Sequence, residues 1–237
     1  MRMRWHLLKK NKSVLVAIDI IVTEDGSHSL LNVEMNETYH SRHGAILESN
    51  YVFIEKGLDF LLTKNPSKVI SILEIGFGTG LNAWLSWQWA EKKNKSIAYY
   101  TLEAFPVSEE IWRSLNYTTT DSEGSKFRQM HNVPWQKWQS MDDSFTLFKE
   151  ETTLQVAALL PNHFDLIYFD AFAPNKQPEM WELPMLEKIV SAMKAQAVFV
   201  TYCAKGQLKR DLKSLGLIVE SLPGSPGKRE MVRAIKI

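Results

Sequence analysis

An acidic residue and three glycines stand where an apolar stretch of the chain gives way to a helical pattern. The segment is Leu73 to Leu81, LEIGFGTGL, in which Glu74 precedes Gly76, Gly78 and Gly80. Glycine takes backbone conformations that a Cβ excludes and lets a ligand approach the main chain. The N–H groups that open the following helix attract the anionic end of a ligand. The segment therefore predicts a binding site for a nucleotide-like molecule.

The position of Glu74 indicates which molecule this is. Dinucleotide folds space their glycines as G-x-G-x-x-G, so that a pyrophosphate lies on the helix N-terminus. Here the spacing is Glu-x-Gly-x-Gly-x-Gly, and the carboxylate would repel a pyrophosphate. It suits S-adenosylmethionine, which carries an ammonium and a sulfonium. The spacing resembles motif I of the class I methyltransferases, and the alternatives are another nucleotide or a purely structural glycine turn.

Two further acids are candidates for contacts with the same ligand. Glu103 lies 23 residues beyond Gly80 at the end of a predicted strand, close to the roughly 20-residue offset at which an acid binds ribose hydroxyls in such folds. An exposed acid at a strand end is the alternative. The adenine-binding acid of methyltransferases usually follows a later strand as Gly-Asp, whereas this chain has Lys149 to Thr153, KEETT. Glu151 is the candidate there.

Asp170 is the candidate for chemistry on a second substrate. It follows the apolar segment Phe164–Phe169, so it should project from the carboxyl edge of the sheet, where ligands of open α/β sheets bind. A carboxylate there can accept a proton or a hydrogen bond from an amine, and a helix-capping or turn Asp is the alternative. Since an unperturbed Asp has a pKa near 3.9, it is a poor base in water, and much of its role is expected to be positional.

The elements that must position these residues alternate between strand and helix. Strands are expected at Ala98–Leu102, Phe145–Phe148, Phe164–Phe169 and Ala195–Tyr202, with a closing pair at Leu217–Leu222 and Met231–Ile237. The alternation predicts an α/β, Rossmann-like, mostly parallel sheet with one antiparallel strand. Residues 1–50 are expected to form a β-hairpin appendage, with strands at Ser13–Thr23 and Ser27–Val33, and residues 51–237 the class I methyltransferase domain. Residues 104–144 have weak periodicity, and no elements are predicted there.

The composition limits the class of protein. The chain has 237 residues, of which 45 % are apolar and 23 % charged, as in a globular protein of one sizeable domain plus an appendage. No apolar stretch approaches the roughly 20 residues of a membrane span, and the N-terminus lacks a signal-peptide core. The single cysteine, Cys203, favours the cytoplasm. His40 and His43 have metal-like spacing but no third ligand, so no metal is expected.

The charge is divided unevenly along the chain. Residues 1–12 hold five basic side chains and no acid, and residues 205–237 hold eight basic against three acidic. The two ends therefore carry about +10 together, and residues 13–204 carry about −9. This asymmetry favours a polyanion such as a nucleic acid beside an acidic core, and the alternative is a pair of solvated charged termini.

Together these segments resemble the MnmC-like tRNA methyltransferases. The resemblance rests on motif I at Glu74–Leu81 and on two more specific strings, DAFAPNKQPEMW at Asp170–Trp181 and GKREM at Gly227–Met231. The segments Asp25–Leu30, Tyr39–Ser49 and Val52–Leu58 are also similar to the opening of that family, so the resemblance spans nearly the whole chain.

The resemblance implies methyl transfer from S-adenosylmethionine to the aminomethyl nitrogen of 5-aminomethyl-2-thiouridine at the tRNA wobble position. It places Asp170 at the reaction centre and implies tRNA contacts from Tyr39, His40, Lys176, Lys228 and Arg229. Many relatives are fused to a flavin-dependent oxidase. This sequence shows no G-x-G-x-x-G after its Lys-Arg-Glu-Met string, so we expect methyltransferase activity alone, without flavin.

Two other functions remain open at this point. A class I methyltransferase or an aminopropyltransferase that acts on a small amine would also use an Asp after this strand, although a small cation gains nothing from basic chain ends. A tRNA-binding protein without catalysis, which keeps the adenosyl pocket for stability, is the alternative outside the enzymes. The presence of both Glu74 and Asp170 argues against it.

Overall fold

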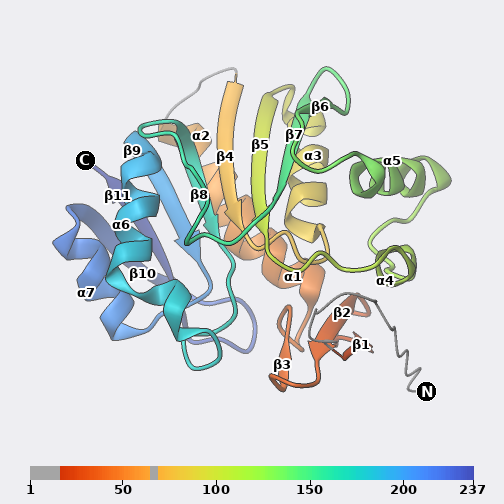
Figure 1. Ribbon diagram of the computed structural model, residues 1–237, viewed down its shortest axis with the longest axis horizontal. Helices are drawn as coiled ribbons and strands as arrows, with labels where there is room; N and C mark the ends of the chain where they lie inside the picture. The colour runs from red at the N-terminus through yellow and green to blue at the C-terminus, as the bar shows by residue number, and fades with distance from the viewer. Residues whose placement is uncertain (1–16, 65–68) are drawn as a thin grey trace.

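The computed structural model describes residues 17–64 and 69–237, which form an eight-stranded mixed sheet and a small three-stranded sheet (Figure 1). The basic segment 1–12 and the first residues of the strand expected at Ser13–Thr23 lie outside the described residues. The large sheet consists of β4 (Val69–Ile75), β5 (Ser96–Glu103), β6 (Gln139–Ser140), β7 (Phe145–Glu151), β8 (Phe164–Phe169), β9 (Met193–Thr201), β10 (Leu217–Pro223) and β11 (Glu230–Lys236).

The spatial order of this sheet is β10-β11-β9-β8-β4-β5-β7-β6. Strands β9, β8, β4, β5 and β7 are parallel, and β11 runs antiparallel to both β9 and β10. The predicted Rossmann-like sheet with its antiparallel closing strand is confirmed. The sequence did not predict β6, a two-residue strand that pairs antiparallel with β7 at the edge.

The helices either precede β4 or lie in the connections between strands of this sheet. They are α1 (Ala45–Ser49), the π-helical segment η1 (Asn50–Asp59), α2 (Phe60–Lys64), α3 (Leu81–Lys93), α4 (Glu109–Arg113), α5 (Asp121–Asn132), the 3₁₀ turn η2 (Pro178–Trp181), α6 (Leu183–Ala192) and α7 (Gly206–Ser214). Within the described part of the chain, none of them is long and apolar enough to cross a membrane.

Two hydrophobic cores cover the two faces of the sheet. Successive residues of a strand point to opposite faces, and the central strands obey this rule: Leu166 and Tyr168 belong to one core, and Ile167 and Phe169 to the other. The first core packs under η1, α2, α3 and α5, and the second under α6 and α7. Apolar burial on both faces therefore holds the central strands, and it leaves their carboxyl edge free for polar side chains.

The small sheet at the N-terminal side is β1 (Ile18–Val22), β2 (His28–Asn32) and β3 (Glu37–Thr38), all antiparallel. The predicted hairpin is confirmed, and β3 extends it by one strand. The sheet is attached to the segment between α4 and α5 by long-range hydrogen bonds, including one from the Tyr117 hydroxyl to the His28 carbonyl at 2.8 Å. The helical run Ala45–Lys64 crosses position 50, and the domain division there remains a prediction.

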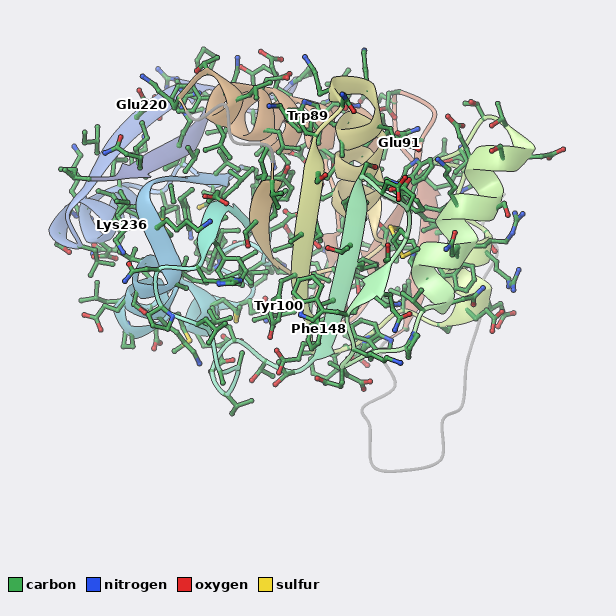
Figure 2. All side chains as sticks on the ribbon, turned by 90° about the horizontal axis from the view of Figure 1, so that it is seen from above. Trp89, Glu91, Tyr100, Phe148, Glu220 and Lys236 are labelled. Atoms are coloured by element: carbon green, nitrogen blue, oxygen red, sulfur yellow. The ribbon has the colours of Figure 1, made fainter. Side chains whose placement is uncertain are left out.

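Strand β7 is longer than the sequence indicated. It continues through Lys149 and Glu150 to Glu151, so the segment interpreted as the loop after the strand belongs to the strand. Its register explains the difference, because Tyr100 of β5 lies opposite Phe148 and the two rings stack at 4.9 Å (Figure 2). Pairing with a buried neighbouring strand outweighs the low strand propensity of the charged residues.

Residues 104–144, for which no elements were predicted, contain α4, α5 and β6. Helix α5 begins with a capping box, in which the Thr120 hydroxyl accepts the Glu123 N–H and the Glu123 side chain accepts the Thr120 N–H. Its polar composition hides the apolar face, which consists mainly of Phe127 and Met130. The helix ends beside the motif I segment, where His131 contacts the Thr79 carbonyl at 3.2 Å.

Asp165 generates a prediction about stability, because its carboxylate connects three neighbouring strands. It accepts the Ser71 N–H of β4 at 2.8 Å and contacts the Lys194 ammonium of β9 at 2.8 Å. Asp165→Ala leaves a buried N–H without an acceptor, so we expect the free energy of unfolding to fall by about 1–3 kcal/mol. Lys194→Ala removes only a half-exposed partner and should cost less than about 1 kcal/mol. Urea denaturation followed by circular dichroism measures both, and equal losses would contradict the dominant role of the backbone hydrogen bond.

Candidate active site

The predicted site acids meet at the carboxyl edge of the large sheet. Strand β4 lies between β5 and β8, so the chain moves outward from β4 in both directions. The crevice at such a switch point is where open α/β sheets bind ligands. Glu74 lies in β4 next to its end, Glu103 and Glu151 end β5 and β7, and Asp170 follows β8. The sheet thus brings four carboxyl groups to one edge.

Glu74 is completely buried at this edge. One carboxyl oxygen accepts the Thr101 hydroxyl at 2.7 Å, and the other, Oε1, receives no hydrogen bond of regular geometry from the described residues. Burial raises the pKa of Glu74 to about 8, helped by the nearby Asp170 charge and opposed by Thr101. A buried carboxyl oxygen that still lacks a donor fits the ammonium of a ligand, since such an oxygen is costly to leave unpaired.

The glycines of motif I provide the close backbone approach. Gly76 has φ +94°, and a Cβ there would come within 2.9 Å of the Asp170 carbonyl. Gly78 has φ +51° and lies under the Tyr39 ring, 3.2 Å from where a Cβ would be. Gly80 is the residue before α3, whose first N–H groups face the same edge. A side chain at Gly76 would therefore collide with the segment that follows β8.

Glu103 connects the two ligand-facing loops. Its carboxylate accepts the Gly78 N–H at 2.9 Å and the Phe105 N–H at 2.8 Å. Burial raises the pKa of Glu103, and these backbone donors oppose the rise. Glu151 lies directly across from it in the sheet register and is exposed. Glu74 and Glu103 together, with the glycines between them, fit the ammonium and ribose ends of S-adenosylmethionine.

Asp170 lies beside the first turn of α3. Its Oδ2 accepts the Asn82 side-chain amide at 2.8 Å. Burial raises the pKa of Asp170 to about 7. The Asn82 hydrogen bond and the Lys228 charge oppose this rise, and the Glu48 charge adds to it. An unperturbed Asp is a poor base in water, and burial brings the pKa of this carboxyl group close to neutral pH, where a general base works best.

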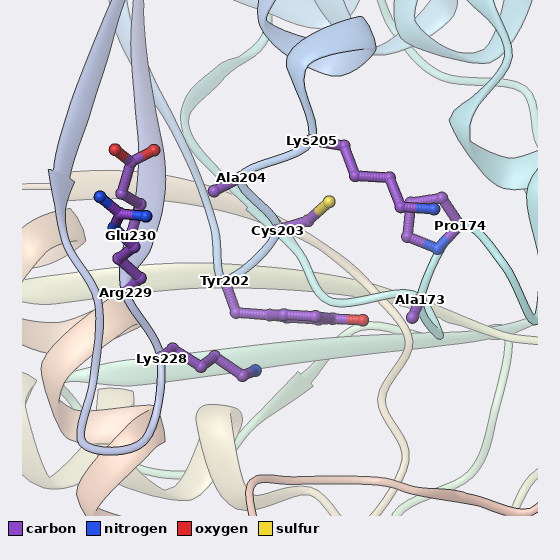
Figure 3. A pocket seen from close by; sticks show the side chains of 9 residues that line it. All are labelled: Ala173, Pro174, Tyr202, Cys203, Ala204, Lys205, Lys228, Arg229 and Glu230. Carbon is purple, nitrogen blue, oxygen red and sulfur yellow. The ribbon is translucent and has the colours of Figure 1, made fainter.

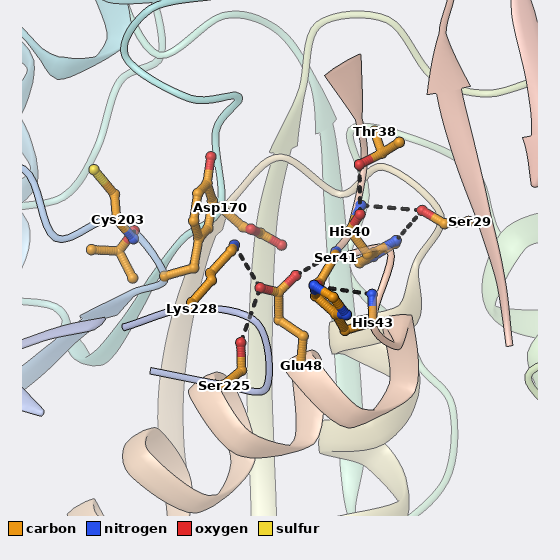
Figure 4. A network of polar contacts seen from close by, with 12 residues as sticks. Ser29, Thr38, His40, Ser41, His43, Glu48, Asp170, Cys203, Ser225 and Lys228 are labelled. Carbon is orange, nitrogen blue, oxygen red and sulfur yellow. Dashed lines mark hydrogen bonds and ion pairs between the residues drawn. The ribbon is translucent and has the colours of Figure 1, made fainter. Parts of the chain in front are cut away.

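Glu48 of α1 is a site residue that the sequence did not reveal. Its carboxylate is buried and accepts the Ser41 N–H at 2.7 Å and the Ser225 hydroxyl at 3.3 Å, and it pairs with the Lys228 ammonium at 2.6 Å (Figure 4). These partners come from segments far apart in the chain, so no local pattern identifies them. The only hint was that Glu48 falls within Tyr39–Ser49, one of the segments of the family resemblance.

Three of the five residues predicted to contact tRNA make contacts within the protein. Tyr39 covers the motif I loop and packs edge-on against Phe172 at 5.1 Å. His40 is buried, contacts the Ser29 hydroxyl at 3.1 Å and has its pKa lowered by burial to about 4. Lys176 donates to the Met35 carbonyl at 2.7 Å, which ties the loop after β8 to the small sheet.

The other two tRNA candidates, Lys228 and Arg229, lie at a pocket beside Asp170. It has a volume of about 420 Å³, and Tyr202 and Cys203 line it together with three cationic residues (Figure 3). Lys205 and Arg229 are exposed, whereas the Lys228 ammonium lies over the Tyr202 ring, 3.8 Å from its centroid. Cys203 is buried in the second core, and burial raises its pKa.

Lys149 is a second charged residue whose position the sequence did not indicate. It is buried in β7, and its ammonium donates to the Met130 and His131 carbonyls at 3.1 and 2.7 Å. These carbonyls belong to the last turn of α5, where a cation is favourable. Burial lowers the pKa of Lys149 to about 8. Lys149 thereby fixes the end of α5 against the motif I loop.

Comparison with known proteins supports the predicted resemblance. A family model described as S-adenosyl-L-methionine-dependent methyltransferase matches residues 126–237. The crystal structure of MNMC2 from Aquifex aeolicus matches with a TM-score of 0.76 and 25 % sequence identity. The match covers 92 % of this chain and 70 % of the MNMC2 chain. The chain is similar to the MnmC-like S-adenosylmethionine-dependent methyltransferases. The predicted resemblance and cofactor are confirmed.

The curated relatives of this MnmC-like chain are longer proteins. "tRNA 5-methylaminomethyl-2-thiouridine biosynthesis bifunctional protein MnmC" of Nitrosospira multiformis is 29 % identical over 86 % of this chain, and that of Methylobacillus flagellatus is 28 % identical over 85 %. The chain spans only 35 % and 33 % of their lengths. Spermidine synthase from Thermotoga maritima, with a TM-score of 0.60 at 14 % identity, shares the fold alone.

Glu74 yields a prediction in which stability and ligand binding change in opposite directions. The pKa of Glu74 is about 8 in the folded protein and 4.5 in the unfolded chain. The stability that comes from its neutral form is therefore fully present below pH 4.5 and is lost as pH rises through 8. Glu74→Gln cannot ionise, so its effect on the free energy of unfolding should be more favourable at pH 8 than at pH 4.5, by ~2 kcal/mol or more. The same variant should bind S-adenosylmethionine about 10- to 100-fold more weakly. Urea denaturation and calorimetry measure the two quantities, and unchanged affinity would remove Glu74 from the binding site.

Proposed function

We propose that this methyltransferase transfers a methyl group to the aminomethyl nitrogen of 5-aminomethyl-2-thiouridine at the wobble position of tRNA. The observation that carries the proposal is the environment of Asp170, a carboxyl group with a pKa of about 7 next to a pocket lined by cationic side chains. The first feature suits an amine nucleophile and the second suits a phosphate-bearing substrate. The MnmC relatives are named for the biosynthesis of 5-methylaminomethyl-2-thiouridine in tRNA, which supports the same substrate.

The chemistry requires a neutral amine, because an ammonium has no lone pair with which to attack. S-adenosylmethionine supplies an electrophilic methyl group when it is bound. Asp170 takes a proton from the ammonium form of the substrate, which leaves the neutral amine, and its position next to Asn82 and the α3 N-terminus fixes the direction of the carboxylate. Glu74 would hold the ammonium of the methyl donor, and Glu103 would hold its ribose. Holding both reactants in this way supplies much of the rate acceleration.

The pocket offers contacts suited to an RNA backbone. Lys205 and Arg229 are exposed at its rim, and Glu230 beside them is neutralised by the Lys209 ammonium at 2.6 Å. The rim therefore presents net positive charge next to a carboxylate-rich interior, which agrees with the charge division along the chain. A small cationic amine gains nothing from this rim, whereas a phosphate-bearing substrate does, and this favours tRNA over a small amine.

The proposed reaction is tested by nucleoside mass spectrometry. The substrate is tRNA that carries 5-aminomethyl-2-thiouridine, incubated with the protein and S-adenosylmethionine. The expected product gains one methyl group at this nucleoside, which is 5-methylaminomethyl-2-thiouridine. Methylation of another nucleoside, or of a free amine but not of the tRNA, would reject the proposal in favour of a different substrate.

Asp170 makes a prediction about the pH dependence of the reaction. The group is neutral below its pKa of about 7, so the single-turnover rate should rise as pH increases through 7. Asp170→Asn should lower the rate about 100-fold or more and leave donor binding within a few fold, because general-base catalysis contributes about 10²–10⁴. Asn82→Ala removes a hydrogen bond that lowers this pKa and should shift the midpoint to higher pH. Turnover of Asp170→Asn at the parental rate at neutral pH would exclude Asp170 from the mechanism.

Lys205 and Arg229 make a prediction about salt. Phosphate contacts release counterions, so changing both residues to Ala should flatten the logarithmic dependence of tRNA affinity on salt by about 1.5 to 2 units. Lys92→Ala with Lys213→Ala is the matched control, since both stand in the last turns of helices that begin at the carboxyl edge and run away from it. Filter binding over a range of salt concentrations measures the slope. An unchanged slope in the rim variant would mean that the RNA binds elsewhere.

A further inference from the structure

Lys228 does not extend toward the solvent, although it lies in the exposed turn between β10 and β11. Its ammonium is 2.6 Å from Glu48 Oε1 and 3.8 Å from the centroid of the Tyr202 ring. Figure 4 shows it directed between the carboxyl groups of Glu48 and Asp170. Two carboxyl groups and one aromatic face thus surround a single ammonium at the inner end of the pocket.

Each of these groups is held in place without the help of Lys228. Glu48 receives the Ser41 N–H and the Ser225 hydroxyl, and Asp170 receives the Asn82 amide. The Tyr202 hydroxyl donates to the Ala171 carbonyl at 2.8 Å, which fixes the ring beside the loop after β8. The arrangement is therefore a preorganised receptor for an ammonium, since carboxylates and the face of an aromatic ring are the groups that bind one.

We propose that Glu48, Tyr202 and Asp170 form the binding site for the ammonium of the substrate, and that Lys228 occupies it as an internal competitor until the substrate displaces it. The proposal deepens the proposed function, on which the identity of the amine rests. Glu48 then binds the cation as it arrives, and Asp170 is in position to take its proton. The displaced Lys228 joins the cations at the pocket rim.

The asymmetry between Lys228 and Glu48 supports a displaceable partner. The Glu48 side chain is 7 % exposed and lies on a helix, whereas the Lys228 side chain is 31 % exposed and follows Gly227 in a turn outside the β10–β11 ladder. The receptor is thus buried and rigid, and the competitor enters from the open side. That open side is the pocket, whose lining includes both Tyr202 and Lys228.

The test compares two small probes of the same shape, benzylamine and benzyl alcohol, of which only the first carries an ammonium. Titration calorimetry or NMR titration measures the affinity of each. Lys228→Met removes the competitor, so benzylamine should bind about tenfold more tightly while benzyl alcohol stays within about twofold. Glu48→Gln removes a receptor group and should weaken benzylamine by about tenfold or more.

Lys205→Met is the matched control, because it removes a positive charge from the same pocket without removing a partner of Glu48. Its effect on benzylamine should stay within about twofold at 0.15 M salt, since exposed charges are screened. Thermal unfolding establishes that each variant is folded. If Lys228→Met does not fold, a comparison of Tyr202→Leu with Tyr202→Phe replaces it. Only Tyr202→Leu, which removes the aromatic ring, should weaken the binding of benzylamine.

The possible outcomes separate this proposal from the proposed function. An equal gain for both probes in Lys228→Met, or no gain for either, would overturn the ammonium site. So would a gain in Lys205→Met as large as that in Lys228→Met. If benzylamine follows the expected pattern while the tRNA is not methylated, the ammonium site stands and the proposed substrate is wrong.

Discussion

Burial of two carboxyl groups at the ends of adjacent parallel strands is the constraint on which the rest of the site depends. Loss of contact with water raises the pKa, and so the cost of ionisation, of both Glu74 and Asp170, and the Asp170 charge adds to that cost for Glu74. The fold offsets this cost with the Thr101 hydroxyl, the Asn82 amide and the N-terminal end of α3. A positively charged ligand removes what remains of it. The site is thus least stable in its empty form and gains most from a cation, which is a property suited to S-adenosylmethionine and to an amine substrate alike.

The distribution of charge around this pair follows from the sheet. Parallel strands deliver their carboxyl ends to one edge, so acids that are distant in sequence become neighbours there. The cations lie at the same edge on two other segments, the loop after β9 and the β10–β11 turn. The interior therefore attracts cations while the rim attracts anions, and a molecule that carries both, such as an amine attached to a nucleic acid, satisfies both.

Sequence patterns predicted the residues whose positions are set locally. Glu74, Glu103 and Asp170 each lie at the end of an apolar strand, and the strand order carries them to the ligand edge. Glu48 could not be found in this way, because its partners Ser41, Ser225 and Lys228 meet only when the fold closes. Helix α5 was missed because its polar face dominates its composition, and the end of β7 because pairing with β5 overrides propensity. The sequence thus predicted the architecture and the donor side better than the acceptor side.

The reversed direction of β11 has a consequence for how such enzymes diversify. Since β10 and β11 pair through residues 217–223 and 230–236, the turn between them projects from the carboxyl edge without contributing to the ladder. Its length and composition can change while every strand keeps its register. Glu74 and Glu103 belong to β4 and β5, in a different part of the sheet, and would keep their positions. Insertions and substitutions in a single hairpin can therefore change the contacts around Glu48 and Asp170 while the strands that carry Glu74 and Glu103 stay the same.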